Sequence, residues 1–171
     1  MNAGAWGGEI SENLIHVELI NSKNKIKKIL KKDLNFSYRK SSFKKDDILL
    51  SAKFNLKKAD ENIIHENFIK AQSGRKNTQP LNQRSAGSLF KNPENNSAGQ
   101  LLDEAGLKGF SIGDAMISDK HANFFINNGK ASSIDMIRLI KKAHGEVLER
   151  FKINLSLEVK LMGFSEDEIE G

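Results

Sequence analysis

One short segment, RSAGSLFKNP at residues 84–93, gathers several side chains that can do chemistry. Ser88 carries a hydroxyl directly after Gly87, and Lys91 and Asn92 follow within four residues. A serine hydroxyl, a lysine ammonium group and an asparagine amide can each donate a hydrogen bond. Taken alone, the same residues also fit an ordinary polar turn.

Three more segments carry charged or titratable side chains. Arg39, in YRKSSF, can clamp a phosphate or carboxylate with two parallel hydrogen bonds, although a lone arginine also fits an ordinary surface position. Glu158 and Lys160 lie two residues apart in the alternating segment LSLEVKLMG, which places them on one face of a predicted strand. An exposed ion pair between strands is the simpler interpretation of that face. His121, in KHAN, is most simply a strand-entry residue that is hydrogen-bonded to the backbone.

The elements that must position these groups predict an α+β fold in two small parts, with strands and helices segregated rather than strictly alternating. In the first part, lysines interleave with apolar residues at 23–33 at the spacing of an amphipathic surface helix. Alternation or helical periodicity predicts two strands, at 13–20 and 48–56, and a helix at 58–72. The polar stretch 73–83 is the best candidate boundary.

The second part has clearer start and stop signals. Ser97 and Gln100 form a capping-box pair for a helix at 97–106, and Gly106 occupies the position of a left-handed cap. A strand at 122–127 carries apolar residues on both faces, so we expect it to be central. Ser132 and Asp135 cap a longer helix at 133–150, and a final strand is predicted at 155–163.

Composition excludes several classes of function. The 171 residues include no cysteine, which excludes disulfides, thiolate catalysis and cysteine-based zinc sites, and the four histidines have no metal-ligand spacing. The net charge of +5 permits anionic partners, but one tyrosine, one tryptophan and evenly spread lysines argue against nucleic acid. No apolar run is long enough to span a membrane, and the first ten residues do not have the pattern of a signal peptide, so a cytoplasmic location is expected.

The motifs also match one family in order and spacing. The chain resembles the C-terminal half to two-thirds of UDP-N-acetylenolpyruvoylglucosamine reductase, in the compact branch of that family. The resemblance covers nearly the whole chain up to Gly163. It is carried by MNAGAWGGEI (1–10), YRKSSFK (38–44), GRKNTQP (74–80), SAGSLFKNP (85–93), AGQLLDEAGLKG (98–109), SDKHANFFINNGKAS (118–132) and LSLEVKLMG (155–163).

This resemblance implies an activity and a role for each matching residue. In the family, NADPH reduces FAD, and a hydride then passes to the enolpyruvyl double bond of UDP-N-acetylglucosamine-enolpyruvate, which gives UDP-N-acetylmuramate for peptidoglycan. It implies that Ser88 is the proton donor, and that Arg39 and Glu158 polarise the substrate carboxylate. The resemblance assigns substrate binding to Lys91, Asn92 and Lys160. Lys160 stands where the family often has arginine, whose guanidinium can bind an anion with two hydrogen bonds where a lysine offers only a point charge.

The resemblance also implies that part of the family fold has no counterpart in this chain. Residues 1–74 are expected to be part of an FAD-binding subdomain, of whose cofactor loop only Asn2, Ala3, Gly4 and Ala5 match, and 75–171 a substrate-binding domain. We therefore expect weak or no FAD binding by this chain alone, exposed apolar surface in the first part, and activity only with a separate polypeptide that supplies the flavin half. The alternative is an inactive relic that retains only the nucleotide-sugar-binding domain.

Overall fold

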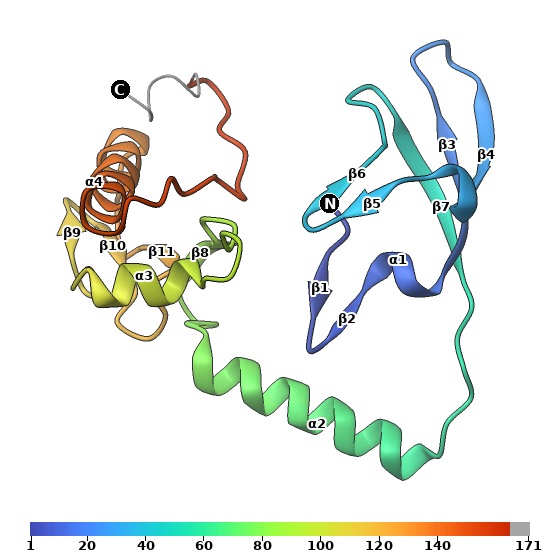
Figure 1. Ribbon diagram of the computed structural model, residues 1–171, viewed down its shortest axis with the longest axis horizontal. Coiled ribbons are helices and arrows are strands. Elements are labelled where there is room, and N and C mark those ends of the chain that lie inside the picture. The colour runs from blue at the N-terminus through green and yellow to red at the C-terminus, as the bar shows by residue number, and fades with distance from the viewer. Residues whose placement is uncertain (165–171) are drawn as a thin grey trace. The chain divides into compact units, whose positions relative to one another are not determined.

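The computed structural model describes residues 1–164, and the chain divides into two compact units, Met1–Ile69 and Lys70–Gly171. Each unit combines helices with antiparallel strands (Figure 1), so the predicted α+β class is confirmed. The division falls within the helix α2 (Glu61–Thr78). This helix continues through the first half of the polar stretch that was predicted to be a boundary.

The first unit is built on a three-stranded sheet of order β4-β3-β7. Leu14, Val17, Leu19 and Leu34 form its small buried core. The elements before α2 are β1 (Gly4–Ala5), β2 (Gly8–Glu9), α1 (Ile10–Asn13), β3 (Leu14–Ile20), β4 (Ile26–Leu30), a 3-10 turn (Lys31–Asp33), β5 (Phe36–Ser37), β6 (Lys40–Ser41) and β7 (Ile48–Phe54).

The predicted amphipathic helix at 23–33 is wrong, because β4 and the 3-10 turn occupy this segment. The side-chain oxygen of Asn21 accepts hydrogen bonds from the backbone N–H groups of Lys23 and Lys25, and Asn24 has a positive φ of 54°. These features form a tight turn, so the chain reverses and pairs β4 with β3. Pairing with a neighbouring strand overrides a helical spacing of apolar residues.

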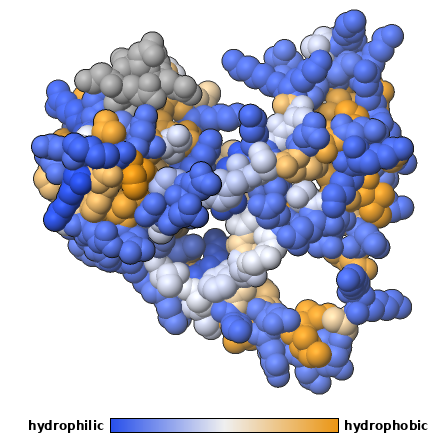
Figure 2. Space-filling view, in the orientation of Figure 1, coloured by the Kyte–Doolittle hydropathy of each residue, from blue (hydrophilic) through white to orange (hydrophobic). Residues whose placement is uncertain are grey.

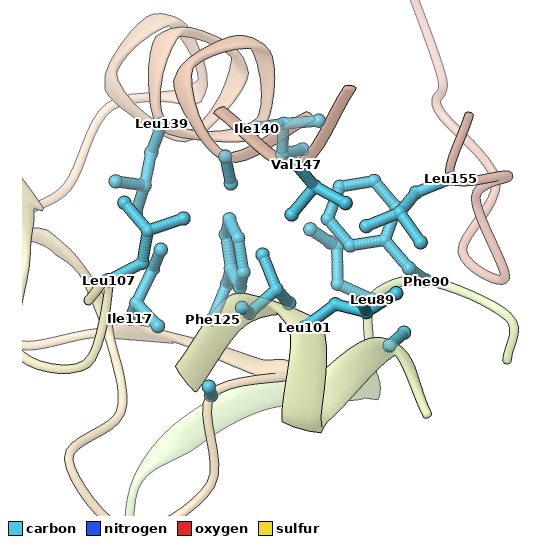
Figure 3. Packing of buried hydrophobic residues seen from close by; sticks show 14 of the residues in the cluster. Leu89, Phe90, Leu101, Leu107, Ile117, Phe125, Leu139, Ile140, Val147 and Leu155 are labelled. Carbon is cyan, nitrogen blue, oxygen red and sulfur yellow. The ribbon is translucent and has the colours of Figure 1, made fainter. Parts of the chain in front are cut away.

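The second unit places two helices against a four-stranded antiparallel sheet of order β8-β11-β10-β9. Its elements after α2 are β8 (Arg84–Ser88), α3 (Ala98–Glu104), β9 (Ser111–Ile112), β10 (Ala115–Ile117), β11 (Phe124–Asn127) and α4 (Ser133–Phe151). Apolar side chains from both helices, the sheet and the segment after α4 meet in one core (Figure 3). The prediction that 122–127 is a central strand is confirmed, since β11 lies between β8 and β10.

The helix caps of the second unit follow the sequence signals closely. Ser132 and Asp135 form the full capping box that starts α4. The hydroxyl oxygen of Ser97 accepts from the backbone N–H of Gln100, but the Gln100 side chain donates to Glu104 instead of closing the box. The predicted box at α3 is therefore only half formed.

The predicted final strand at 155–163 is also wrong. Only Leu157 forms a β-bridge, with Phe90, and the rest of the segment is not strand. Its alternating apolar residues still pack on the core: Leu155 is buried, and Leu157, Val159 and Leu161 are partly buried against the same cluster. The alternation correctly predicts which side chains are inside, but no neighbouring strand lies along the whole segment to make a ladder.

Candidate functional site

A β-bulge at the end of β8 presents Ser88. Strand β8 pairs Ser85 with Ile126 and Ser88 with Phe124, so it has one residue more than β11 between these two pairs. Gly87 lies in the bulge with a φ of +90°, a conformation that glycine adopts without steric cost. Apart from Gly87 and its two chain neighbours, no described residue has an atom within 4 Å of the position that a Cβ on Gly87 would take. Bulges re-aim side chains, and Ser88, the residue that follows, is half-buried.

Glu158 is held next to Ser88 by backbone pairing. Its N–H donates to the carbonyl oxygen of Leu89 at 2.8 Å, and the N–H of Lys91 donates to the carbonyl oxygen of Ser156 at 2.8 Å. The segment 156–158 therefore runs antiparallel to residues 89–91, although it belongs to no regular strand. Glu158 is therefore paired with the residue that follows Ser88 in the chain, and both Ser88 and Glu158 are half-buried.

The predicted substrate-binding residues of this unit have different surroundings. Lys91 is half-buried, while Asn92 and Lys160 are exposed. The side-chain oxygen of Asn92 accepts a hydrogen bond from the N–H of Ala98 at 3.0 Å, so it closes the loop that leads into α3. Asn92 therefore has a structural role that the sequence did not predict.

Arg39 lies in the other unit, at a strained position of a tight hairpin. Strands β5 and β6 pair Ser37 with Lys40, which leaves Tyr38 and Arg39 as the two turn residues, and Arg39 has a φ of +52°. A residue with a Cβ pays roughly 1 kcal/mol or more in this region, where glycine would not. The Arg39 Nη2 donates to the carbonyl oxygen of Gly4 at 3.3 Å, and its guanidinium carbon lies 4.8 Å from the centre of the Tyr38 ring. An arginine at a position that favours glycine points to a role for its side chain.

The segment predicted to contact a cofactor folds back on itself as the β1–β2 hairpin. Gly4 and Ala5 pair with Glu9 and Gly8, and the carbonyl oxygen of Ala3 accepts from the N–H of Ile10 at 3.0 Å. The hairpin therefore uses much of this segment's backbone internally. Because Arg39 donates to Gly4, the predicted catalytic arginine touches the predicted cofactor segment.

Asn2 is only 5% exposed, and its side chain forms hydrogen bonds within the first unit. Its Nδ2 donates to the Glu9 carboxylate at 2.6 Å and to the carbonyl oxygen of Ser37 at 3.3 Å, and its Oδ1 accepts from the N–H of Ser11 at 3.1 Å. The side chain thus links the hairpin to β5. Contact with a cofactor would come through the backbone of Ala3–Ala5 rather than through the Asn2 amide.

Sequence reasoning missed Asn123, which is buried beside the Ser88 segment and 3% exposed. Its neighbour His121 follows the prediction, because the His121 Nδ1 accepts a hydrogen bond from the backbone N–H of Asn123 at 3.2 Å. Burial lowers the pKa of His121 below 6.5, and the positive charge of Lys108 lowers it further. The one signal for Asn123 in the sequence is a lone amide among the apolar residues that enter β11.

Residues 1–164 hold no group of three or more histidine, aspartate or glutamate residues that could bind a metal ion. They also contain no helix that combines the length and the apolar character needed to cross a bilayer.

Comparison with known proteins decides the family. Residues 79–162 match the family described as UDP-N-acetylenolpyruvoylglucosamine reductase, C-terminal domain. The UDP-N-acetylenolpyruvoylglucosamine reductase of Aquifex aeolicus (strain VF5) is 44% identical over 162 residues, which are 95% of this chain and 54% of the relative. The chain belongs to this reductase family. The reductase of Clostridium novyi (strain NT) is 42% identical over 164 residues, 95% of this chain and 53% of that relative.

A solved structure of a family member has the same fold. The reductase from Thermus caldophilus aligns with a TM-score of 0.82 at 37% identity, covering 94% of this chain and 57% of the other. The chain thus spans about half the length of the reductases it matches. Its candidate site residues fall into two groups: Ser88, Glu158, Lys91, Asn92 and Lys160 in the second unit, and Arg39 with Asn2–Ala5 in the first.

Proposed function

We propose that this chain takes part in the reduction of UDP-N-acetylglucosamine-enolpyruvate to UDP-N-acetylmuramate, a cytoplasmic step of peptidoglycan precursor synthesis that uses FAD and NADPH. Relatives that match almost the entire chain carry the name of the reductase. The observation that carries the proposal is the hydrogen bond from the Glu158 N–H to the Leu89 carbonyl oxygen, because it holds the backbone of Glu158 beside the residue that follows Ser88.

The chemistry assigned to this chain is the delivery of a proton. A flavin bound at the site and reduced by NADPH would supply a hydride to one alkene carbon, and the neighbouring carbon next to the carboxylate would then carry negative charge. Ser88 gives its hydroxyl proton to that carbon, so the O–H bond breaks as a C–H bond forms. Glu158 binds the substrate carboxylate and favours its enolic form, and Lys91 and Lys160 donate to substrate oxygens. Arg39 is assigned to the same carboxylate by family resemblance.

The described residues fit only one edge of an FAD site. The backbone of Ala3–Ala5 is the part of the candidate segment that can approach a cofactor, since the Asn2 side chain is committed within the fold. A dinucleotide needs many more contacts than three residues supply. We therefore propose that the rest of the flavin site is supplied by the part of the reductase fold that has no counterpart in these residues. Produced as a separate polypeptide, that part should be able to complete the site.

Strand β7 has the features of a docking surface for that polypeptide. Every residue of Ile48–Phe54 is exposed, and among the described strands β7 pairs only with β3, so its outer edge is open. Figure 2 shows hydrophobic side chains at the surface of the β4-β3-β7 sheet and near the start of α2. The opposite edge strand, β4, carries Lys27 and Lys28, which protect an edge from strand addition. Strand β7 has one lysine, Lys53, among four large apolar residues.

Two isoleucines provide a matched test of this docking surface. Ile48 on β7 and Ile26 on β4 both pair with Ile20, from opposite sides, and are 62% and 70% exposed. The probe is the separately produced part of the Aquifex aeolicus reductase that this chain does not match. We expect it to bind the chain in size-exclusion chromatography, Ile48→Lys to abolish binding, and Ile26→Lys to leave it intact. Equal binding by both variants would show that the β7 edge is not the docking surface.

The proposed reaction is tested in a fusion of that unmatched Aquifex part to this chain. We expect NADPH oxidation that depends on the enolpyruvyl substrate, and a loss of ~10²–10⁴ in its rate in Ser88→Ala, with substrate affinity kept. Ser111→Ala is the control, because Ser111 lies on β9, at the opposite edge of the same sheet.

Two results would count against the reaction. Full activity of Ser88→Ala would remove the proton-donor role. A fusion that binds flavin and the nucleotide sugar but never consumes NADPH with substrate would favour the alternative, an inactive chain that retains only nucleotide-sugar binding.

A further inference from the structure

The Asn123 side chain forms two hydrogen bonds to the backbone of Phe90, the residue two positions after Ser88. We call this pair of hydrogen bonds the grip of Asn123. Its Oδ1 accepts from the N–H of Phe90 at 2.9 Å, and its Nδ2 donates to the carbonyl oxygen of Phe90 at 2.8 Å. The backbone carbonyl oxygen of Asn123 accepts from the N–H of Leu89 at 2.8 Å. One residue therefore satisfies three backbone groups of the consecutive residues Leu89 and Phe90, and its amide takes the place of a strand partner.

The same short segment is held from its other side by residues 156–158. The Leu89 carbonyl oxygen accepts from Glu158, and the Lys91 N–H donates to Ser156. Residues 89–91 thus lie between Asn123 and the segment that carries Glu158. A change in the grip of Asn123 shifts Phe90, and with it the positions of both Ser88 and Glu158.

We propose that Asn123 is a positioning residue, whose buried amide aligns the hydroxyl of Ser88 with the carboxyl group of Glu158. The alignment matters for turnover only if Ser88 is the proton donor, so this inference rests on the proposed function. His121 supports the arrangement, since its Nδ1 accepts from the Asn123 N–H and its ring lies edge-on to Phe124, with ring centroids 4.9 Å apart.

Only an amide fits this position. Aspartate keeps an acceptor for the Phe90 N–H but turns a second oxygen toward the Phe90 carbonyl, where asparagine places a donor. Alanine leaves the N–H and the C=O of a residue that is 1% exposed without the partner that each has now. Both changes loosen the segment next to Ser88 without removing any group assigned to the chemistry.

Amide hydrogen exchange in the unmodified and substituted chain tests the grip. We expect Asn123→Asp to accelerate exchange of the Phe90, Lys91 and Glu158 N–H groups by about tenfold, because a buried hydrogen bond to the backbone is lost. Asn127→Ala is the matched control: the Asn127 Oδ1 also accepts from two backbone N–H groups, those of Gly129 and Ala131, but at the far end of β11. Equal acceleration in both variants would overturn the inference.

A second measurement uses the unmodified chain alone, so it does not depend on whether a substituted chain folds. In the unmodified chain, the Asn123 Nδ2 protons should exchange far more slowly than those of the exposed Asn128. If the two amides exchange alike, the grip does not exist in solution and the inference is wrong.

The fusion protein then separates positioning from general stability. We expect Asn123→Asp to lower kcat for the enolpyruvyl substrate at least about tenfold with little change in KM, and to leave reduction of the flavin by NADPH unchanged. Asn127→Ala should lower the melting temperature without this effect on kcat. If Asn123→Asp loosens the segment but kcat is unchanged, the positioning role is wrong. If Ser88→Ala also keeps full activity, it is the proposed function that fails.

Discussion

Alanine at Gly87 and alanine at Gly145 should have opposite effects on the free energy of unfolding, although both changes add one methyl group. Neither position is crowded, because, apart from residues close by in the chain, no described residue has an atom within 4 Å of a Cβ built on either glycine. Steric clashes therefore cannot decide the outcome. The backbone conformation of each glycine decides it instead.

The magnitudes follow from that conformation. Gly87 has a φ of +90°, where a residue with a Cβ pays about 1–2 kcal/mol, offset by about 0.4–1 kcal/mol from the reduced freedom of the unfolded chain. The expected net loss is about 1 kcal/mol. Gly145 lies exposed inside α4, where alanine is favoured over glycine by about 1 kcal/mol. The two variants should therefore differ by about 2 kcal/mol.

Urea unfolding followed by circular dichroism measures this difference. With slopes of ~1–3 kcal/mol/M for small proteins, the midpoints of the two variants should lie about 1 M apart, on either side of the unmodified chain. Gly87→Asn should be less destabilised than Gly87→Ala, because asparagine tolerates a positive φ better. A Gly87→Ala midpoint equal to or above that of the unmodified chain would refute the argument that the bulge requires glycine.

Two further predictions concern His121 and Arg39. Burial lowers the pKa of His121, so the unfolded chain binds a proton more readily than the folded one. The contribution of neutral His121 to the free energy of unfolding should therefore be fully present above pH 6.5 and be lost as the pH falls below 6.5. Urea midpoints measured across that range should show this fall in the unmodified chain and not in His121→Gln. Arg39→Gly relieves a positive φ at the cost of the side-chain contacts of Arg39, among them the hydrogen bond to Gly4 and the contact with the Tyr38 ring. We expect the two effects to offset each other, so the melting temperature should change little while the fusion protein loses turnover. A large fall in melting temperature with activity kept would mean that Arg39 is structural.

Local signals in the sequence were enough to predict much of the second unit. Ser132 and Asp135 cap α4 because a capping box needs only residues three positions apart, and Ser97 starts α3 for the same reason. The apolar character of 122–127 predicts an inner strand, and the alternation at 155–161 predicts which side chains reach the core. The family motifs single out Ser88 and Glu158, and a backbone hydrogen bond holds Glu158 beside Leu89, the residue after Ser88.

Contacts between distant residues account for what the pattern could not reveal. Residues 26–30 form a strand because β3 lies beside them, and residues 155–163 form no strand because their pairing with residues 89–91 amounts to a single β-bridge, at Leu157. The bulge at Gly87 and the grip of Asn123 on Phe90 both depend on how β8 meets β11, more than thirty residues further along the chain. Helix caps and helical or strand periodicity depend on residues that are close in the sequence. Strand register and the placement of Glu158 near Ser88, by contrast, arise only when separate segments pack against each other.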